Sequence, residues 1–406
     1  MNNSVLVTDA SKRASLAAIR SLGRRGVRVA ALDPSRFAAG FLSRYCSEKI
    51  LCPNPQQNPA GFLKTVEKEL STGKYDVFLP VHDFSLIPVL KNKDKLEKHA
   101  AIPFVDFETF EKTADKSITQ GIASKAGVRT PRSFYPSSLL QVERLSDKLD
   151  YPVVVKARSQ TQAGDGKATT AYVSAKSYCH NPRELLAQFD LVFKKTGVAP
   201  IIQEYVAGKG VGVAALFNKG KPRALFSYKR VREYPISGGP STLRESTDDA
   251  FLKKQAEKIL RALKWHGLAM VEFKQPAKGE AAFLEVNGRF WGSVQLAVSS
   301  GVDFPFLLYK MAVDGDVAPV KKYAVGVKQK WLMPGDLLHY AQKLRFSKGK
   351  LGVASEFASS LLLEKCYEDY FDPRDPLPAF GALGTSLKYL KDFILKKRSL
   401  EGEYVA

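Results

Sequence analysis

The sequence is poor in residues that would build a covalent or metal-bound framework. It holds four cysteines among 406 residues, and no two of them have C-x-x-C spacing. This spacing supports neither a disulfide framework nor a structural zinc site, and free thiols in a reducing cytoplasm are the expectation. Four of the five histidines, His99, His180, His266 and His339, show no metal-ligand spacing either.

Long apolar runs are absent as well. No stretch of about 18 apolar residues occurs, so we expect no transmembrane helix. The first residues lead directly into the strand-like Val5-Leu6-Val7, without the apolar core of a signal peptide. Together these features predict a cytoplasmic protein without a membrane span.

Acidic residues are outnumbered by basic ones. There are 41 Asp and Glu against 62 Lys and Arg, a net charge of +21, and the excess is largest between residues 113 and 310. Such a bias is found in nucleic-acid-binding proteins, but also where a site holds a triphosphate and an anionic substrate. No RNA- or DNA-binding motif with interleaved aromatic residues is present. We therefore expect no nucleic acid and keep that class as an alternative.

A chain of this length with 45% hydrophobic residues is expected to form two or three globular domains. In residues 1–112, strand-like segments at 4–7, 27–32 and 77–80 alternate with helical ones such as 14–24, which predicts a parallel α/β sheet. A dinucleotide-binding domain with Asp33 on a ribose is the competing interpretation. Because the first turn, Thr8 to Lys12, lacks G-x-G-x-x-G, Asp33 is expected to be a strand-end or turn residue.

The pattern changes near residue 113. A helix is expected from Thr113 to Lys125, an apolar strand ends at Lys156, and a Gly-containing loop follows over residues 159–167. The next expected elements are a helix at 182–195, a strand at 201–206, a hairpin at 211–231 with its turn at 218–221, a helix at 249–264, and strands at 268–274 and 282–286. Beyond about residue 315 we expect amphipathic helices, including one at 386–397.

Three oxygen-bearing side chains converge in the last two of these strands. Residues two apart in a strand share a face, so Glu285 and Asn287 project to the same side. A short hairpin would place Glu272 of the preceding strand beside them. Two carboxylates and an amide suit Mg²⁺, which proteins hold with a few oxygen ligands together with substrate phosphates. A solvated strand face with incidental acids is the alternative interpretation.

Four segments, in order, resemble the motifs of the ATP-grasp superfamily, which includes biotin carboxylase, the large chain of carbamoyl-phosphate synthase and D-alanine–D-alanine ligase. The segments are Asp115-Lys116, Val154-Val155-Lys156-Ala157, Gln203-Glu204-Tyr205-Val206, and Glu272 together with Phe283 to Arg289. One such segment is weak evidence, but four in order are strong. Residues 228–246 further resemble a carboxylate–amine ligase-like subgroup.

The resemblance implies an architecture. Residues 1–112 would form the parallel α/β domain that usually precedes this fold, and residues 113–314 the ATP-grasp domain, in which two α+β subdomains clasp ATP. A smaller lid subdomain would span residues 130–203, approximately. Residues 315–406 are expected to be a mostly helical C-terminal extension.

The resemblance also implies roles for individual residues. The residues expected to bind ATP are Lys116 and Lys156 at the phosphates, Gln203, Glu204 and Val206 near the adenine, and Gly164, Asp165 and Gly166 in the lid loop. The ligands of Mg²⁺ or Mn²⁺ are expected to be Glu272, Glu285 and Asn287, and Arg289 is expected to meet the γ-phosphate or the acyl phosphate. The lid loop has fewer glycines than usual in this family. Val211 and Gly212 stand where several relatives carry a ribose-binding acid, so the ribose contact is unassigned.

Arginines follow the predicted hairpin. Alternation puts Arg230 and Arg232 on one strand face, and Arg244 lies a little further on. A guanidinium binds a carboxylate or phosphate with two parallel N–H groups, so this segment is a candidate wall for an anionic substrate, with Arg230 and Arg244 as catalytic candidates. A charged, exposed strand is the alternative. His82 and Asp83 are either a catalytic pair or structural residues of a loop.

These features predict an ADP-forming ligase that uses ATP and Mg²⁺ to activate a carboxylate as an acyl phosphate and join it to an amine. Its partners would be small-molecule carboxylate and amine substrates, and a homodimer is left open as the assembly. Two alternatives remain: a non-catalytic ATP- or metabolite-binding regulatory protein, and a basic nucleic-acid-associated protein.

Overall fold

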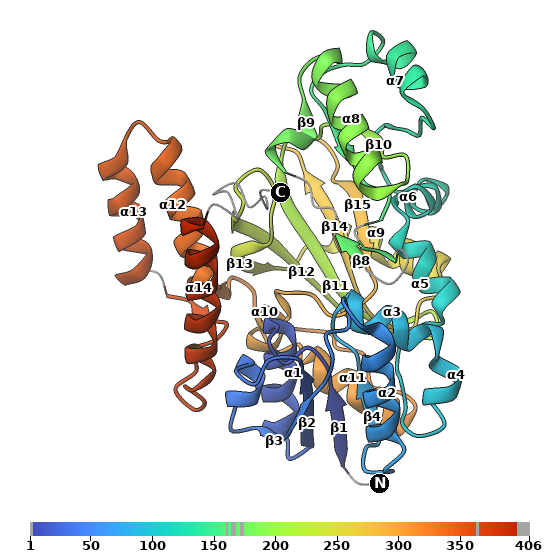
Figure 1. Cartoon of the computed structure of the whole chain (residues 1–406), viewed down its shortest axis with the longest axis vertical. Coiled ribbons are helices and arrows are strands. Elements are labelled where there is room, and N and C mark those ends of the chain that lie inside the picture. Colours follow the sequence, from blue (N-terminus) through green and yellow to red (C-terminus); the bar gives the residue numbers. More distant parts are fainter. Residues whose placement is uncertain (1–2, 160, 164–167, 171–173, 363–364, 396–406) are drawn as a thin grey trace. The chain divides into compact units, whose positions relative to one another are not determined.

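The computed structural model describes residues 3–159, 161–163, 168–170, 174–362 and 365–395 (Figure 1). The chain forms two compact units, each built from separate stretches. The first unit comprises Met1–Phe104, Tyr228–Asp248 and Arg289–Ala406, and the second Val105–Ser227 and Asp249–Gly288. This division follows space rather than chain order, and the domain boundaries expected from the sequence stay predictions.

The N-terminal part of the first unit is a parallel sheet, as predicted. Its strands are β1 (Ser4–Val7), β2 (Arg28–Asp33), β3 (Cys46–Leu51) and β4 (Val77–Leu79), in the order β3-β2-β1-β4. The helices between and after these strands are α1 (Arg13–Arg24), α2 (Pro59–Leu70), α3 (Asp83–Lys91) and α4 (Lys93–Leu96). Leu16, Ile19 and Leu22 of α1 are fully buried. Burying a side chain of this size contributes about 1.5–3 kcal/mol, so the apolar spacing of α1 fixes it on the unit's core.

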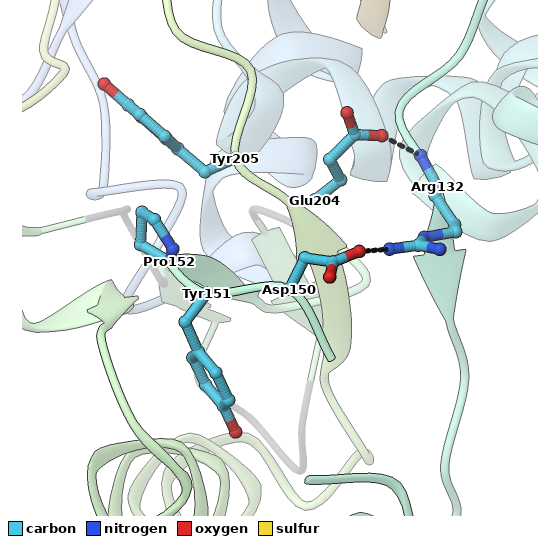
Figure 2. Close-up of a pocket in the computed structure, with 6 residues that line it drawn as sticks. All are labelled: Arg132, Asp150, Tyr151, Pro152, Glu204 and Tyr205. Carbon is cyan, nitrogen blue, oxygen red and sulfur yellow. Dashed lines mark hydrogen bonds and ion pairs between the residues drawn. The ribbon is translucent and has the colours of Figure 1, made fainter. Parts of the chain in front are cut away.

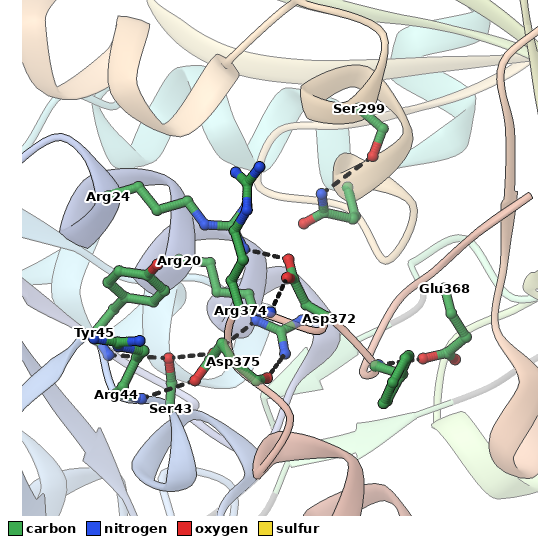
Figure 3. Close-up of polar contacts among 12 residues, drawn as sticks. Arg20, Arg24, Ser43, Arg44, Tyr45, Ser299, Glu368, Asp372, Arg374 and Asp375 are labelled. Atoms are coloured by element: carbon green, nitrogen blue, oxygen red, sulfur yellow. Dashed lines mark hydrogen bonds and ion pairs between the residues drawn. The ribbon is translucent and has the colours of Figure 1, made fainter.

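Arginines of α1 hold the C-terminal part of the first unit (Figure 3). Arg20 donates from Nε to Asp375 Oδ2 at 2.8 Å, and its other nitrogens donate to the carbonyls of Asp369 and Tyr370. Ser43 Oγ donates to the same Asp375 oxygen at 2.7 Å. Because Arg20 and Asp375 are buried, this pairing explains why residues near both ends of the chain belong to one unit.

The second unit contains a four-stranded antiparallel sheet. Its strands are β5 (Ser133–Phe134), β6 (Val153–Lys156), β9 (Tyr178–Cys179) and β10 (Ile201–Glu204), in the order β5-β10-β6-β9. Helices α7 (Leu139–Ser146) and α8 (Pro182–Thr196) pack on it around a core that includes Val155, Phe189 and Ile202. Asn181 caps the start of α8, and Gly197, with φ of +69°, ends it. Two short strands, β7 (Thr161–Ala163) and β8 (Ala168–Thr170), pair with each other.

A larger sheet has seven strands. In the second unit its order is β15 (Ala282–Asn287), β14 (Gly267–Gln275), β11 (Lys209–Asn218) and β12 (Lys221–Glu233). Strand β12 continues into the first unit, where β13 (Ser241–Thr247), β16 (Lys328–Lys330) and β17 (Tyr367–Glu368) follow. The predicted hairpin turn at 218–221 is confirmed, with positive φ at Lys219 and Gly220.

The remaining helices confirm some expectations and correct others. Their bounds are α5 (Phe107–Ala114), α6 (Lys116–Lys125), α9 (Ala250–Ala262), α10 (Val294–Ser299), α11 (Phe304–Asp314), α12 (Leu337–Phe346), α13 (Lys350–Leu362) and α14 (Pro378–Ile394). The single helix start expected at Thr113 is wrong, because Asp115 separates two helices and caps the second by accepting from Ser117 N and Ile118 N. Helix α14 starts before the expected residue 386, and β16 and β17 were not predicted. Within the described residues, no helix combines the length and hydropathy needed to cross a bilayer.

Candidate active site

Two acids and an amide meet on adjacent strands of the second unit. Glu272 of β14 lies directly opposite Glu285 of β15. Asn287 Nδ2 lies 3.3 Å from Glu272 Oε1 and 3.4 Å from Glu285 Oε1. The structure thus brings together the three residues predicted as metal ligands. Across the described residues, no group of three His, Cys, Asp or Glu side chains is placed to hold a metal, and the metal-binding role of these three residues stays a prediction.

Lys116 is the immediate partner of this group. Its Nζ lies 2.9 Å from Glu285 Oε2, and both side chains are mostly buried. Burial alone would raise the pKa of Glu285, but the ammonium groups of Lys116 and Lys156 outweigh it and hold the pKa below its usual value. The backbone of Lys116 is fixed at the first position of α6, where its N–H donates to the Arg158 carbonyl. Glu285 is therefore an anion beside a cation, both within one unit.

Lys156 ends β6 and points to the same cluster. Its Nζ donates to Gln203 Oε1 at 2.6 Å. Burial lowers the pKa of Lys156 to about 8, while Glu285 and Glu272 act in the opposite direction. Ile201 pairs with Lys156 across the sheet, and Gln203, two residues on, projects to the same face. Lys116, Lys156, Glu272 and Glu285 thus form one cluster of two cations and two anions.

Glu204 lies apart from this cluster. As the neighbour of Gln203 on β10 it projects to the opposite face, where its Oε2 accepts from Arg132 N at 2.9 Å. It lines a hollow of about 450 Å³ together with Arg132, Asp150, Tyr151, Pro152 and Tyr205 (Figure 2). Of the two polar residues predicted near the adenine, only Gln203 shares the face of Lys156. Val206 follows β10 and is buried. The lid residues Gly164, Asp165 and Gly166 lie outside the described residues.

Arg289 belongs to the first unit, where its partner is Asp83. The Arg289 Nε donates to Asp83 Oδ1 at 2.7 Å. His82 caps α3 by accepting from Phe84 N, and burial, helped by Lys12 and Arg289, lowers the pKa of His82 to about 3. A neutral capping imidazole fits the structural interpretation of this pair. Sequence reasoning considered Asp83 only beside His82, and no local signal shows that it binds an arginine 206 positions away.

Asp33 is confirmed as a strand-end residue. Its carboxylate accepts from Ser11 N at 2.7 Å and Ser11 Oγ at 2.8 Å, and also from Ser35 N. These bonds brace the first turn of the parallel sheet, which is a structural role.

The three arginines of the predicted anion-binding wall all have acidic partners. Arg230 lies 3.1 Å from Glu233, and Arg232 lies 2.6 Å from Asp336. Arg244 is fully buried and ion-paired with Asp369. The guanidinium groups of this segment are therefore paired with acids and do not form an exposed row. The roles of Arg230 and Arg244 stay predictions.

Comparison with known proteins decides the fold. A family model described as "ATP-grasp in the biosynthetic pathway with Ter operon" matches residues 198–332. Biotin carboxylase from Campylobacter jejuni is similar in structure, with a TM-score of 0.64 and 16% identity over 80% of this chain and 74% of that one. The chain has the ATP-grasp fold. No curated protein matches it in sequence.

Two further solved structures are similar over most of the chain. L-amino acid ligase from Bacillus licheniformis has a TM-score of 0.57 and 16% identity, covering 78% of this chain and 77% of that one. N5-carboxyaminoimidazole synthetase from Staphylococcus aureus, complexed with ADP, has a TM-score of 0.60 and 16% identity, covering 80% of both chains. The segment matched by the ATP-grasp family model includes Glu272, Glu285 and Asn287, whereas Lys116 and Lys156 lie before it.

Proposed function

We propose that this chain is an ADP-forming ligase that activates a carboxylate as an acyl phosphate and joins it to an amine. The observation that carries the proposal is the cluster of Lys116, Lys156, Glu272, Glu285 and Asn287 within an ATP-grasp fold. Two opposed acids and an amide beside two lysines are what a metal–triphosphate complex requires.

Mg²⁺ is the proposed metal, and when bound it would neutralise charge on the β- and γ-phosphates. Glu272, Glu285 and Asn287 would hold it, leaving the other coordination positions to phosphate oxygens. Lys116 would then exchange its bond to Glu285 for a phosphate oxygen, and Lys156 would donate to another. A related domain, the biotin carboxylase domain of the Hydrogenobacter thermophilus 2-oxoglutarate carboxylase, was solved with MgADP and bicarbonate.

The nucleotide base and the outer phosphates are assigned to further residues. Gln203 and the backbone of Val206 are proposed for the adenine, since the Glu204 side chain already binds Arg132 N. Backbone N–H groups of Gly164, Asp165 and Gly166 are proposed to cover the phosphates. Arg289, two residues after Asn287, is proposed for the γ-phosphate or the acyl phosphate.

The proposed reaction transfers one oxygen atom from the carboxylate to the released phosphate. A carboxylate oxygen attacks the γ-phosphorus, the bond to the bridging oxygen of ADP breaks, and ADP leaves. The amine then attacks the acyl carbon, and phosphate leaves with the oxygen that came from the carboxylate. The amine loses a proton to give the amide. One ¹⁸O from a labelled carboxylate must therefore appear in the released phosphate.

The test measures ADP release over a matrix of carboxylates and amines, followed by ¹⁸O analysis of phosphate for any active pair. We expect carboxylate-dependent ADP and singly labelled phosphate, and neither with Glu285→Gln. ATP binding without ADP release across the matrix would favour a non-catalytic regulatory protein. ADP release with unlabelled phosphate would contradict the acyl phosphate.

The cellular compartment and the oligomeric state of the chain are also proposals. The four cysteines are free, which supports a reducing compartment such as the cytoplasm. A homodimer is proposed because the related 2-oxoglutarate carboxylase domain is described as a dimer. Sedimentation at two ionic strengths tests the assembly, and the same experiment with added RNA tests the nucleic-acid alternative.

A further inference from the structure

Four buried polar atoms on one face of the large sheet have no hydrogen-bond partner among the residues that the structure describes. They are Nε and Nη1 of Arg244, Oγ1 of Thr242 and Nε1 of Trp331. Buried polar atoms without a partner are rare in folded proteins, and each needs an explanation such as a bound water or ion. Four such atoms on neighbouring residues of the first unit call for a common explanation.

The sheet geometry places these side chains together. Thr242 and Arg244 are two residues apart on β13, so they share a face. Trp331 lies opposite Thr242. The backbone N–H of Trp331 donates to the Thr242 carbonyl at 2.7 Å, which continues the register of the β13–β16 pair. Residues directly opposite in an antiparallel pair project to the same side. A guanidinium, a hydroxyl and an indole N–H therefore line one face of the sheet.

The basic side chains near these atoms outnumber their acidic partners. Arg13, at the start of α1, lies over the Trp331 ring with its Cζ 3.8 Å from the ring centroid. Arg13 and Arg244 share a single carboxylate, that of Asp369. The same Asp369 also accepts from Gln329 Nε2 at 3.1 Å. One carboxylate serves two guanidinium groups and an amide.

The other nearby acid is already committed. Glu368 turns its carboxylate to the backbone, where it accepts from Leu332 N at 3.2 Å and from Tyr370 N at 2.6 Å. Burial raises the pKa of Glu368, and its carboxylate oxygens are taken up by these backbone N–H groups. Gly292 completes the surroundings, since a β-carbon there would lie 3.0 Å from Arg13 Nη2.

We propose that Arg244, Thr242 and Trp331 bind the carboxylate of a small organic acid. Only an acceptor satisfies a guanidinium nitrogen, a hydroxyl and an indole N–H at once, and a charged acceptor makes the stronger bonds. Arg13 and Trp331 are partly exposed while Arg244 is not, so they form the entrance. The choice of a carboxylate over another anion rests on the proposed function, in which a carboxylate is a substrate.

The test uses acetate and inorganic phosphate as probes of the full chain without ATP. The temperature of thermal unfolding is measured against each anion, with sodium chloride holding the ionic strength constant, for the wild type, Thr242→Val and the exposed control Thr72→Val. We expect acetate to raise the unfolding temperature of the wild type and of Thr72→Val. In Thr242→Val, which keeps the shape and removes the hydroxyl, the apparent Kd for acetate should rise about tenfold or more.

Three outcomes overturn the proposal. These are no response of the wild type to acetate, an equal response in Thr242→Val, and a response to phosphate without one to acetate. Thr242→Val should fold at least as well as the wild type without ligand, because it removes an unpaired buried hydroxyl. Because ATP is absent, failure here leaves ADP formation untouched. An acetate response in a chain that forms no ADP would keep the site and reject the proposed ligase.

Discussion

Two buried ion pairs, one in each unit, differ in what surrounds them. In the second unit, Lys116 meets Glu285 beside Lys156 and Glu272, and Lys156 donates to Gln203. In the first unit, Arg20 meets Asp375 inside a network in which both oxygens of the carboxylate accept hydrogen bonds, from Arg20, Ser43 and the backbone of Arg44. Lysine presents a compact charge on a flexible stem, and arginine a planar fork.

That difference separates a pair that can change partners from a pair that holds the chain together. A phosphate oxygen can replace Glu285 as the acceptor at Lys116 with little rearrangement, because the ammonium group sits on a flexible stem and can turn to a new acceptor. Removing Asp375 leaves a buried guanidinium facing carbonyls alone. We therefore expect substitutions in the Lys116–Glu285 pair to affect nucleotide chemistry, and substitutions in the Arg20–Asp375 pair to affect stability.

The largest expected effect on catalysis comes from Glu285→Gln. The change keeps the volume but removes one of two metal-binding charges, so ADP formation should fall to background while circular dichroism stays unchanged. Glu280→Gln, at an exposed position in the same unit, is the matched control and should keep full activity. ADP formation at the wild-type rate in Glu285→Gln would remove Glu285 from the metal site.

The largest expected effect on stability comes from Asp375→Asn. Breaking a buried pair leaves the Arg20 charge unpaired, which costs about 3–5 kcal/mol of unfolding free energy. Arg24 and Asp372 form a nearby pair with side chains 30% and 24% exposed, shown with Arg20 and Asp375 in Figure 3. Asp372→Asn should cost at most about 1 kcal/mol. Urea denaturation checks both, and equal costs would mean that burial does not separate the two pairs.

The contrast also explains how far the sequence could predict this molecule. The parallel strands, the hairpin turn at 218–221 and the convergence of Glu272, Glu285 and Asn287 follow from period-two alternation and short connections, which are local. Partners distant in sequence have no such signal. Arg232 binds Asp336 and Arg244 binds Asp369, 104 and 125 positions away. The sequence therefore contains no sign of the acids that pair with the arginines of the predicted anion-binding wall, and β16 and β17 are too short to show alternation.

A smaller effect is expected at Lys156. Lys156→Ala removes one charge-assisted bond to a phosphate, so ATP affinity should fall by about 1.5–3 kcal/mol. Lys125→Ala, at an exposed position of α6, should leave ATP affinity within about 0.5 kcal/mol of the wild type. Isothermal titration calorimetry measures both. Unchanged affinity in Lys156→Ala would place this lysine outside the nucleotide site.

The smallest expected effect is the pH dependence of the same residue. Burial lowers the pKa of Lys156 from its ordinary 10.5 to about 8, so the ammonium that would bind phosphate is lost as pH rises through 8. ATP affinity should then fall about tenfold between pH 7 and 9, one decade per pH unit above the pKa. Stability without ATP should change the other way. Between pH 8 and 10.5 the unfolded chain holds more protons than the folded one, so this residue makes the folded state more stable as pH rises.

Lys156→Arg separates the two effects, because a guanidinium keeps its charge throughout this range. In that variant the ATP affinity should not change between pH 7 and 9. The gain in stability with rising pH that residue 156 causes above pH 8 should disappear. Calorimetry and thermal unfolding at matched pH values measure the two slopes. If the arginine variant keeps the wild-type slope in ATP affinity, another group titrates in the site. A cation other than Lys156 would then be the one that exchanges its partner for a phosphate oxygen, in contrast to the fixed arginine network of the first unit.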